Sequence, residues 1–384
     1  MKDLNAVLSN AVAAGDVPFV VAMSGNSGSI TWSGVAGERS PGLVAAEDTV
    51  FRIFSMTKAI GSTAAMILID RGKLSPDMLV EAILPQFADI KILDGFDGDT
   101  PRLRKPKVKA TVRHLATHTT GFVYDFLSAD IQKYLEATGH PTLASGLKTS
   151  LNYPLVFEPG ERWDYGIGID WLGQIVETVD GRRVDAFCRE EIFDPLGMPD
   201  TDFEVAEHMA NRLAVVQARG EDGQFAEFDL TVPPSNPEFY GMGGALYSTA
   251  PDYMQFLRMF LNKGQLDGNR ILSEASIEIM LANHIGDLRI GKLTTAVPDI
   301  LADTEFFPDF EKTHSLGFMR MEENVPEMRT AGSQFWAGIL NTHYWFDPAR
   351  DVAGLMMTQS LPFAEPRFME VYDRFEQAVY AKAN

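Results

Sequence analysis

The chain has 384 residues, of which 45% are hydrophobic and 22% are charged. This composition is typical of a soluble globular protein, and the length suits two domains or one domain with a large insertion. The formal net charge of −20 argues against nucleic acid and against anionic membrane surfaces as partners.

The cysteine content and the apolar runs indicate where in the cell the protein is expected. Cys188 is the single cysteine, so an internal disulfide is excluded, and a buried structural thiol is expected. Nothing before residue 20 resembles a secretory signal. The apolar run from Ala59 to Ile69 is about half the length needed to cross a bilayer. We therefore expect a cytoplasmic protein.

The N-terminal segment predicts a helix followed by a hairpin. Apolar residues recur at helical spacing from Leu4 to Val12, and Gly15 stops the pattern. Residues 18–23 and 30–35 have the composition of strands, and a glycine-containing turn joins them. A helix followed by an antiparallel hairpin indicates the start of an α+β sheet domain.

The middle of the chain has mainly helical patterns. Helices are expected over 111–118, 128–138, 170–179 and 183–193. Strand patterns are scarce here, so we predict that residues 71–210 form a mostly helical domain inserted into the α+β one.

Sheet patterns return after residue 210. We expect strands over 213–217, 225–228, 339–346 and 352–359, helices over 251–263 and 368–379, and a loop over a cleft at 298–312. The predicted fold class is α+β. An antiparallel sheet with strands from both chain ends is flanked by the N- and C-terminal helices. Residues 1–70 and 211–384 form this domain, and the active site lies in the cleft between it and the insertion.

The segment from Phe51 to Lys58 carries the first chemical motif. Ser55 and Lys58 are three residues apart at the start of a predicted helix, so their side chains share one face. The first turn of a helix favours negative charge on the serine oxygen, and a lysine in apolar surroundings can act as a base. Ser-x-x-Lys is the acylation motif of penicillin-recognising enzymes, although helix capping explains most such tetrapeptides.

Several other chemistries are excluded or disfavoured. The chain has no Gly-x-Ser-x-Gly motif and no Walker loop, and Gly241 to Gly244 lacks the strand–turn–helix setting of a dinucleotide site. His114 and His118 are four residues apart, but the glutamate of His-Glu-x-x-His and a third ligand are missing. No metal site is expected.

Two further segments supply candidate partners for Ser55. Tyr165 lies on a constrained connection between Gly160 and a predicted helix, and a nearby ammonium would favour its phenolate as a general base. Its alternative role is to anchor the loop through its hydroxyl. Near the C-terminus, Gly338 allows close backbone approach, and the amides of Ile339 and Ser55 could form an oxyanion hole.

The three motifs, taken in their order along the chain, resemble those of a known enzyme family. Ser55-Met-Thr-Lys58, Tyr165-Gly-Ile167 and Trp336-Ala-Gly338 resemble the three-motif layout of class C β-lactamases and DD-peptidases, and most closely that of family VIII carboxylesterases. The resemblance implies a β-lactamase/transpeptidase-like fold and an acyl-enzyme on Ser55. It also implies shared acid and base roles for Lys58 and Tyr165, an oxyanion hole from the Ser55 and Ile339 amides, and no cofactor or metal.

Two departures from the lactamase pattern predict neutral esters as substrates. Ile167 stands where lactamases have an asparagine that holds the acylamino group, and Trp336 stands in place of the lysine that binds the substrate carboxylate. An indole can line an apolar pocket but cannot pair with an anion. Tyr124 and Gly338 are further substrate-contact candidates, with packing as the alternative reading for Tyr124.

The sequence therefore predicts a serine carboxylesterase for short- to medium-chain esters. A β-lactamase or DD-peptidase, and an acyltransferase, remain alternatives that use the same residues. A non-catalytic binding protein on this fold is a further alternative, disfavoured because Ser55, Lys58 and Tyr165 are all present. The expected partner is a small-molecule ester, without nucleic acid or membrane, and a homo-oligomer is left open.

Overall fold

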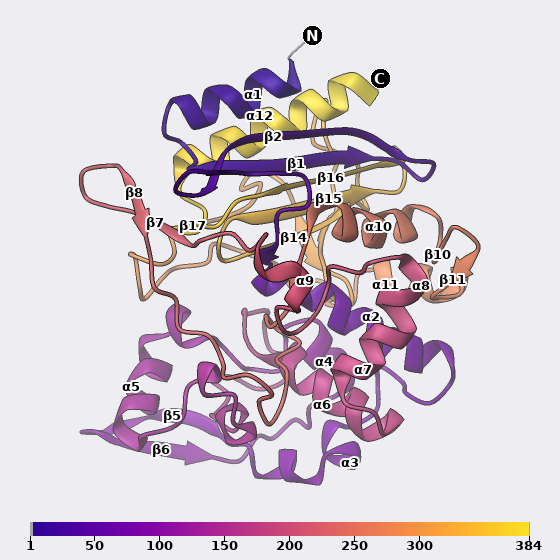
Figure 1. The fold of residues 1–384 in the computed structure, drawn as a ribbon. Coiled ribbons are helices and arrows are strands. Elements are labelled where there is room, and N and C mark those ends of the chain that lie inside the picture. The colour runs from indigo at the N-terminus through magenta and orange to yellow at the C-terminus, as the bar shows by residue number, and fades with distance from the viewer. Residues whose placement is uncertain (1–2, 384) are drawn as a thin grey trace.

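The computed structural model describes residues 3–383. In this part of the chain an eight-stranded antiparallel sheet forms the upper half of the molecule in Figure 1, in the order β12-β13-β14-β15-β16-β1-β2-β3. The strands are β1 (Phe19–Gly25), β2 (Ile30–Ser40), β3 (Leu43–Val44), β12 (Lys312–His314), β13 (Met319–Met321), β14 (Gln334–Gly338), β15 (Thr342–Asp347) and β16 (Val352–Met357). Strand β1 lies between β16 and β2, so the two ends of the chain meet in the sheet as predicted.

Helices cover both faces of this sheet. The terminal helices α1 (Leu4–Ala13) and α12 (Pro366–Ala383) contact each other on one face (Figure 1). On the opposite face, α10 (Ala250–Leu261) contacts β1, β15 and β16. The sheet strands β14 to β16 and β1 are buried throughout, because both of their faces are covered.

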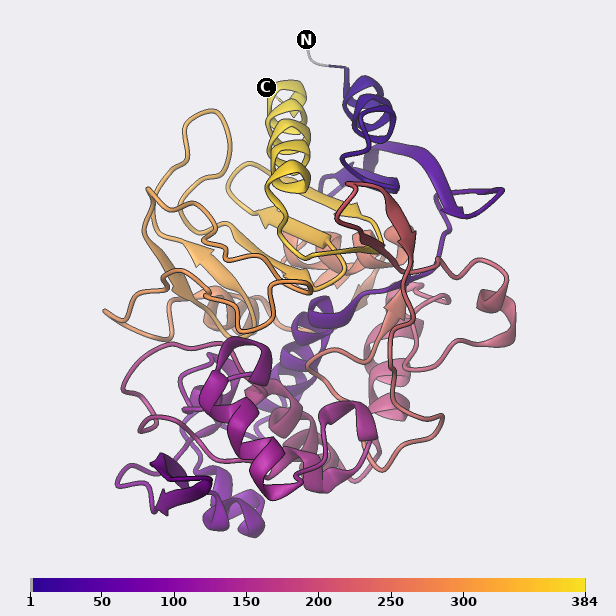
Figure 2. The ribbon, with the colours of Figure 1, turned by 90° about the vertical axis from the view of Figure 1, so that its left-hand side faces the viewer.

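The lower half of the molecule is built mainly from helices. They are α3 (Val80–Ile83), α4 (Val112–Ala116), α5 (Ala129–Thr138), α6 (Gly168–Asp180), α7 (Val184–Cys188), a π-helical turn (Arg189–Phe193) and α8 (Asp194–Leu196). Helices α4 to α7 and the π-helical turn agree with the helices expected from the sequence, whereas α3 and α8 were not expected. Figure 2 shows the lower half from the side, separate from the sheet. The division into domains at residues 70 and 210 stays a prediction.

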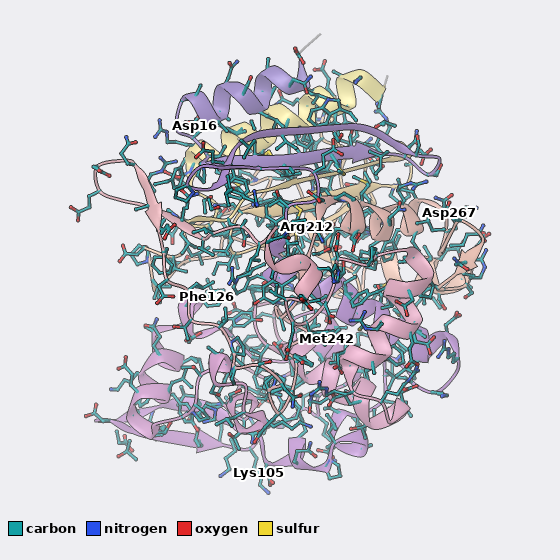
Figure 3. The ribbon with its side chains drawn as sticks, viewed as in Figure 1. Asp16, Lys105, Phe126, Arg212, Met242 and Asp267 are labelled. Atoms are coloured by element: carbon teal, nitrogen blue, oxygen red, sulfur yellow. The ribbon has the colours of Figure 1, made fainter. Side chains whose placement is uncertain are left out.

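A single helix joins the two halves. Helix α2 (Thr57–Asp70) lies between the sheet and the lower helices in Figure 1, and all of its residues from Thr57 to Leu68 are buried. It contacts α6 below and α11 (Glu274–Leu281). Because α2 is surrounded on all sides, its N-terminal end is held rigidly at the junction. Figure 3 places Phe126 and Met242 in the middle part of the molecule, whereas Lys105 lies at its lower end.

The remaining elements are short. They are β4 (Phe51–Arg52), β5 (Ile92–Asp97), β6 (Thr100–Arg104), β7 (Gln217–Arg219), β8 (Phe225–Glu227), β9 (Tyr247–Ser248), β10 (Gln265–Leu266), β11 (Asn269–Arg270), β17 (Ser360–Leu361) and α9 (Glu207–Ala210), with 3₁₀ turns at Phe54–Met56, Pro85–Asp89, Asp125–Leu127, Leu143–Ser145 and Lys148–Leu151. None of the described helices is long and apolar enough to cross a bilayer.

Three sequence expectations differ from the structure. The strand expected over 213–217 begins only at Gln217. The strand expected over 339–346 begins only at Thr342, because Asn341 has a φ of 59° and lies in the turn between β14 and β15. The mostly helical region contains the β5–β6 hairpin, whose turn at Gly98 has a φ of 62° and whose strands are largely exposed. Its weak alternation explains why strand patterns were missed.

Candidate active site

Ser55 lies in a 3₁₀ turn that leads directly into α2. The turn spans Phe54–Met56, and α2 begins at Thr57. Ser55 therefore precedes the α-helix, although it was expected at the start of that helix. Phe54 has a φ of 40°, which is unusual for a residue with a side chain. A constrained backbone is a recurring feature of functional sites, because it fixes the direction of nearby side chains.

Lys58 meets Ser55 as the spacing predicted. Its ammonium Nζ lies 3.2 Å from Ser55 Oγ, and it also donates to the Tyr124 hydroxyl at 3.0 Å and to the Gly243 carbonyl at 2.6 Å. The side chain is 1% exposed. A charged lysine has three N–H donors. Three acceptors therefore satisfy the protonated form completely, despite its burial.

Tyr165 is held beside this ammonium by its backbone. The Asp164 amide donates to the His118 carbonyl at 3.0 Å, and the Tyr124 amide donates to the Tyr165 carbonyl at 3.0 Å. The centre of the Tyr165 ring is 4.7 Å from Lys58 Nζ. Its hydroxyl accepts a 3.2 Å hydrogen bond from Trp336 Nε1. Among the described residues, the hydroxyl has no hydrogen bond to Ser55 or Lys58, so the direct contact expected from the sequence is made by Tyr124 instead.

Burial keeps the Tyr124 hydroxyl protonated. Burial raises the pKa of the Tyr124 hydroxyl well above its usual value, and the neighbouring Asp170 carboxyl raises it further. Tyr124 is therefore a neutral phenol that accepts from Lys58. Its ring centre lies 5.0 Å from that of Tyr165, so both rings flank the ammonium.

The buried Asp170 carboxyl group holds the Gly243 peptide, which in turn contacts Lys58. Asp170, at the start of α6, accepts a 2.8 Å hydrogen bond from the Gly243 amide, and the carbonyl of Gly243 accepts from Lys58. Burial raises the pKa of Asp170, while Lys58 and the Gly243 amide oppose the rise. A Cβ at Gly243 would lie 2.4 Å from an Asp170 oxygen, so a glycine is required for this approach.

The backbone near Gly338 could hold an oxyanion. A Cβ at Gly338 would lie 2.2 Å from the carbonyl oxygen of Ile53, so the glycine lets β14 pack directly against the peptide that precedes the 3₁₀ turn. Among the described residues, the amides of Ser55 and Ile339 donate to no carbonyl or side chain. Free amides on adjoining segments are what an oxyanion hole requires.

A cavity of about 630 Å³ opens in front of Ser55. Its walls are mainly apolar, and they combine residues from both halves of the molecule: Phe54, Ser55, Tyr124, Phe126, Leu135, Leu143, Tyr165, Phe203, Tyr247, Leu293, Leu301, Phe306, Trp336, Ile339 and Phe363. The volume is within the usual range for small-molecule sites.

Some of the substrate-contact residues predicted from the sequence line the cavity, and others do not. Trp336 and Tyr124 line the cavity, as do Leu301 and Phe306 of the loop expected to cover a cleft. Ile167 and Gly338 do not line it. Ile167 is fully buried just before α6, and Gly338 packs against Ile53, so direct substrate contact by these two residues stays a prediction without support from the cavity lining.

Part of the cavity wall was not anticipated. The segment 231–237 contains three prolines and lines the cavity together with residues 141–144 and Gly146. Arg52, three residues before Ser55, also lines it. The proline content of 231–237 was the available sequence feature, but it does not indicate where in space such a loop lies.

Comparisons with known proteins agree with this architecture. A family model described as Beta-lactamase matches residues 4–378. The solved structure of simvastatin synthase (LovD) from Aspergillus terreus superposes with a TM-score of 0.84 at 26% sequence identity, covering 99% of this chain and 97% of that one. The predicted β-lactamase/transpeptidase-like fold is confirmed.

Curated relatives include proteins named for acyl transfer and for ester cleavage. Acyltransferase calJ of Penicillium decumbens is 30% identical over 351 residues, which cover 88% of this chain and 82% of the relative. Lovastatin esterase of Penicillium rubens is 28% identical over 367 residues, covering 91% and 88%. The chain spans 61% of the length of a Mycobacterium tuberculosis protein, Rv1367c, to which it is 34% identical over 247 residues.

Proposed function

The chain belongs to the Beta-lactamase family, and within it we propose that this protein is a serine carboxylesterase that forms an acyl-enzyme on Ser55. The observation that carries the proposal is the 3.2 Å contact between Ser55 Oγ and Lys58 Nζ at the wall of an apolar cavity. A hydroxyl beside a buried lysine is an arrangement for nucleophilic catalysis. Cytoplasmic localisation belongs to the same proposal.

The proposed reaction uses two coupled proton transfers. Ser55 Oγ attacks the ester carbonyl and loses its proton to Tyr165, whose ring lies beside the Lys58 ammonium. The Ser55 and Ile339 amides bind the oxyanion that develops. As the tetrahedral intermediate collapses, the proton passes to the departing alcohol. Water then attacks the acyl-enzyme by the same route and releases the acid.

The proposed division of roles follows from the environment of each phenol. Tyr124 accepts from Lys58, and its raised pKa makes it a poor base. Tyr165 has the same ammonium beside its ring, does not accept from it, and receives the Trp336 N–H at its oxygen. Tyr165 is therefore assigned as the base and Tyr124 as a group that positions Lys58.

The apolar cavity favours esters over β-lactams. Trp336 occupies the position where lactamases place a lysine for the substrate carboxylate, and its ring lies 4.9 Å from the Tyr165 ring. A carboxylate at that position would lose its hydration without gaining a counter-ion. Turnover of nitrocefin faster than that of an ester would favour a β-lactamase instead.

The direct test is hydrolysis of para-nitrophenyl butyrate by the purified protein and by Ser55→Ala. We expect the substitution to abolish turnover, with an unchanged circular dichroism spectrum and melting temperature. Activity retained by Ser55→Ala, with the fold intact, would contradict the proposal.

Acyl transfer is a second candidate function. A cavity of about 630 Å³ exceeds the space that a short acyl ester needs, and it can hold an acceptor alcohol beside the acyl-enzyme. The name of the relative calJ is consistent with this use of the fold. Product analysis with para-nitrophenyl butyrate and a competing secondary alcohol separates the two functions. Ester product that exceeds free butyrate at moderate alcohol concentration would establish transfer as the main reaction.

A further inference from the structure

Arg52 supplies a cation to the wall of the cavity. It forms β4 with Phe51, three residues before Ser55, and pairs with Tyr247 of β9. Both Arg52 and Tyr247 line the cavity. Among the described residues that line it, Arg52 is the one arginine or lysine, since Lys58 is enclosed behind Ser55.

The main chain of Arg52 is fixed while its charge is left unpaired. Gln359 holds the backbone on both sides, accepting from the Arg52 amide at 3.0 Å and donating to its carbonyl at 3.1 Å. The guanidinium lies 5.6 Å from the centre of the Tyr247 ring. No carboxylate of residues 3–383 forms an ion pair with it, although the chain has 53 acidic and 33 basic residues.

The Nε atom of Arg52 also lacks a partner. Arg52 Nε is buried and has no hydrogen-bond partner among the described residues. A buried donor without an acceptor is unfavourable and uncommon in folded proteins. The described residues therefore supply the Arg52 guanidinium with neither an ion pair nor an acceptor at Nε.

The acidic residues of the same cavity are engaged elsewhere. Glu204 accepts from Ser235 Oγ and the Tyr240 hydroxyl, each within 2.8 Å. Asp170 accepts from the Gly243 amide. Asp125, the remaining carboxyl on the wall, forms no ion pair with Arg52. The positive charge of Arg52 is therefore not neutralised from inside the cavity.

We propose that Arg52 binds a carboxylate carried by the substrate, so that the preferred esters are largely apolar molecules with one anionic group. This proposal rests on the proposed ester chemistry at Ser55. A guanidinium matches a carboxylate with two parallel hydrogen bonds. A single cation balances one negative charge, which fits a carboxylate better than a doubly charged phosphate. Trp336 lies on the wall as a neutral surface for the rest of the molecule.

A matched pair of esters tests the preference. Para-butyryloxybenzoate carries a carboxylate, and para-butyryloxybenzamide is its neutral analogue of nearly the same shape. A second pair, the phenyl monoester of glutaric acid and its terminal amide, places the charge on the acyl side. We expect wild type to favour the anionic member of one pair in kcat/KM, and Arg52→Gln to lower the anionic-to-neutral ratio about 10- to 100-fold.

Two variants control for other effects of the charge. Arg289→Gln removes one positive charge at an exposed position outside the cavity, and the ratio should remain as in wild type. Arg52→Lys keeps the charge but loses the two-pronged geometry, and we expect an intermediate ratio. Circular dichroism and melting curves check that each variant is folded.

Binding measurements on inactive variants test the carboxylate site independently of the proposed reaction. The same benzoate and benzamide are titrated calorimetrically into Ser55→Ala and into Ser55→Ala with Arg52→Gln, because neither protein can turn them over. Tighter binding of the benzoate that is lost with Arg52→Gln supports the carboxylate site, even if wild type hydrolyses neither ester. An unchanged preference in both binding and kinetics, or no preference in wild type for either pair, would overturn the inference.

Discussion

The indole N–H of Trp336 donates to the hydroxyl of Tyr165 at 3.2 Å. The residue that replaces the lactamase cation thus contacts the phenol assigned as the base. Trp336→Phe keeps an aromatic ring on the cavity wall but removes this donor. Because one hydrogen bond contributes about 1 kcal/mol, we expect kcat for para-nitrophenyl butyrate to fall about five- to tenfold, with a smaller change in KM.

Trp163 provides the matched control for that substitution. Its indole nitrogen is buried without a partner, and the residue does not line the cavity. Trp163→Phe should therefore leave kcat close to wild type. Equal losses in both variants would indicate that aromatic packing around Tyr165, rather than the hydrogen bond, controls the rate.

Substitution of the two phenols distinguishes their roles. Tyr165→Phe removes the proposed base, and we expect kcat to fall by about 10²- to 10⁴-fold. Tyr124→Phe removes only an acceptor of Lys58, so the loss should be smaller. Steady-state kinetics on the same ester measure both. The reverse order of losses would assign the proton transfer to Tyr124.

Gly338→Ala tests the packing of β14 against the 3₁₀ turn. The new methyl group would lie 2.2 Å from the Ile53 carbonyl oxygen, so β14 must move away from Ser55. A displacement of about 1 Å at an active site can cost about 100-fold, and we expect a loss of that order in kcat/KM. Gly291→Ala is the control, since a Cβ there meets no atom within 4 Å. Full activity in Gly338→Ala would contradict the proposed oxyanion hole.

Asp252 predicts a pH-dependent term in stability. Burial raises the pKa of its carboxyl to about 6, from an unfolded value of 3.8. The folded state therefore binds the proton more tightly, and the free energy of unfolding falls as pH rises from about 4 to 6. The shift corresponds to up to roughly 3 kcal/mol.

Asp252→Asn should remove that dependence. An amide oxygen can still accept from the Asp200 amide and the Thr201 hydroxyl, as the carboxylate does. We expect the variant to be more stable than wild type at pH 7.5 and equal to it near pH 4, as measured by urea unfolding. The exposed Asp267→Asn controls for the loss of one charge. A stability difference that does not vary with pH would refute the assignment.

The sequence anticipated the fold because its periodic patterns are strong where burial is strong. Helices α1, α6, α10 and α12 and the β1–β2 hairpin were predicted from apolar spacing, capping residues and turn composition. The short strands β12 and β13 at one end of the sheet were not, because three residues give no measurable alternation. The turn at Asn341 was missed because the residues around it are apolar and resemble a continuous strand.

The sequence predicted the part of the site whose residues are close together in the chain. Ser55 and Lys58 are three residues apart, and the helical geometry alone brings them together. The contacts of Tyr124, Asp170 and Arg52 arise from segments far apart in the chain, so no spacing rule could reveal them. The same limit explains Ile167, which its motif position suggested for the pocket but which the start of α6 buries.

Covalent labelling of Ser55 tests the central claim most directly. A fluorophosphonate ester is added to wild type and to Ser55→Ala, and intact mass spectrometry is followed by peptide mapping. We predict one phosphonyl adduct per wild-type chain, located on the peptide that contains Ser55, and no adduct on Ser55→Ala. Labelling of Ser55→Ala at the wild-type rate, or an adduct on another residue in wild type, would contradict the account.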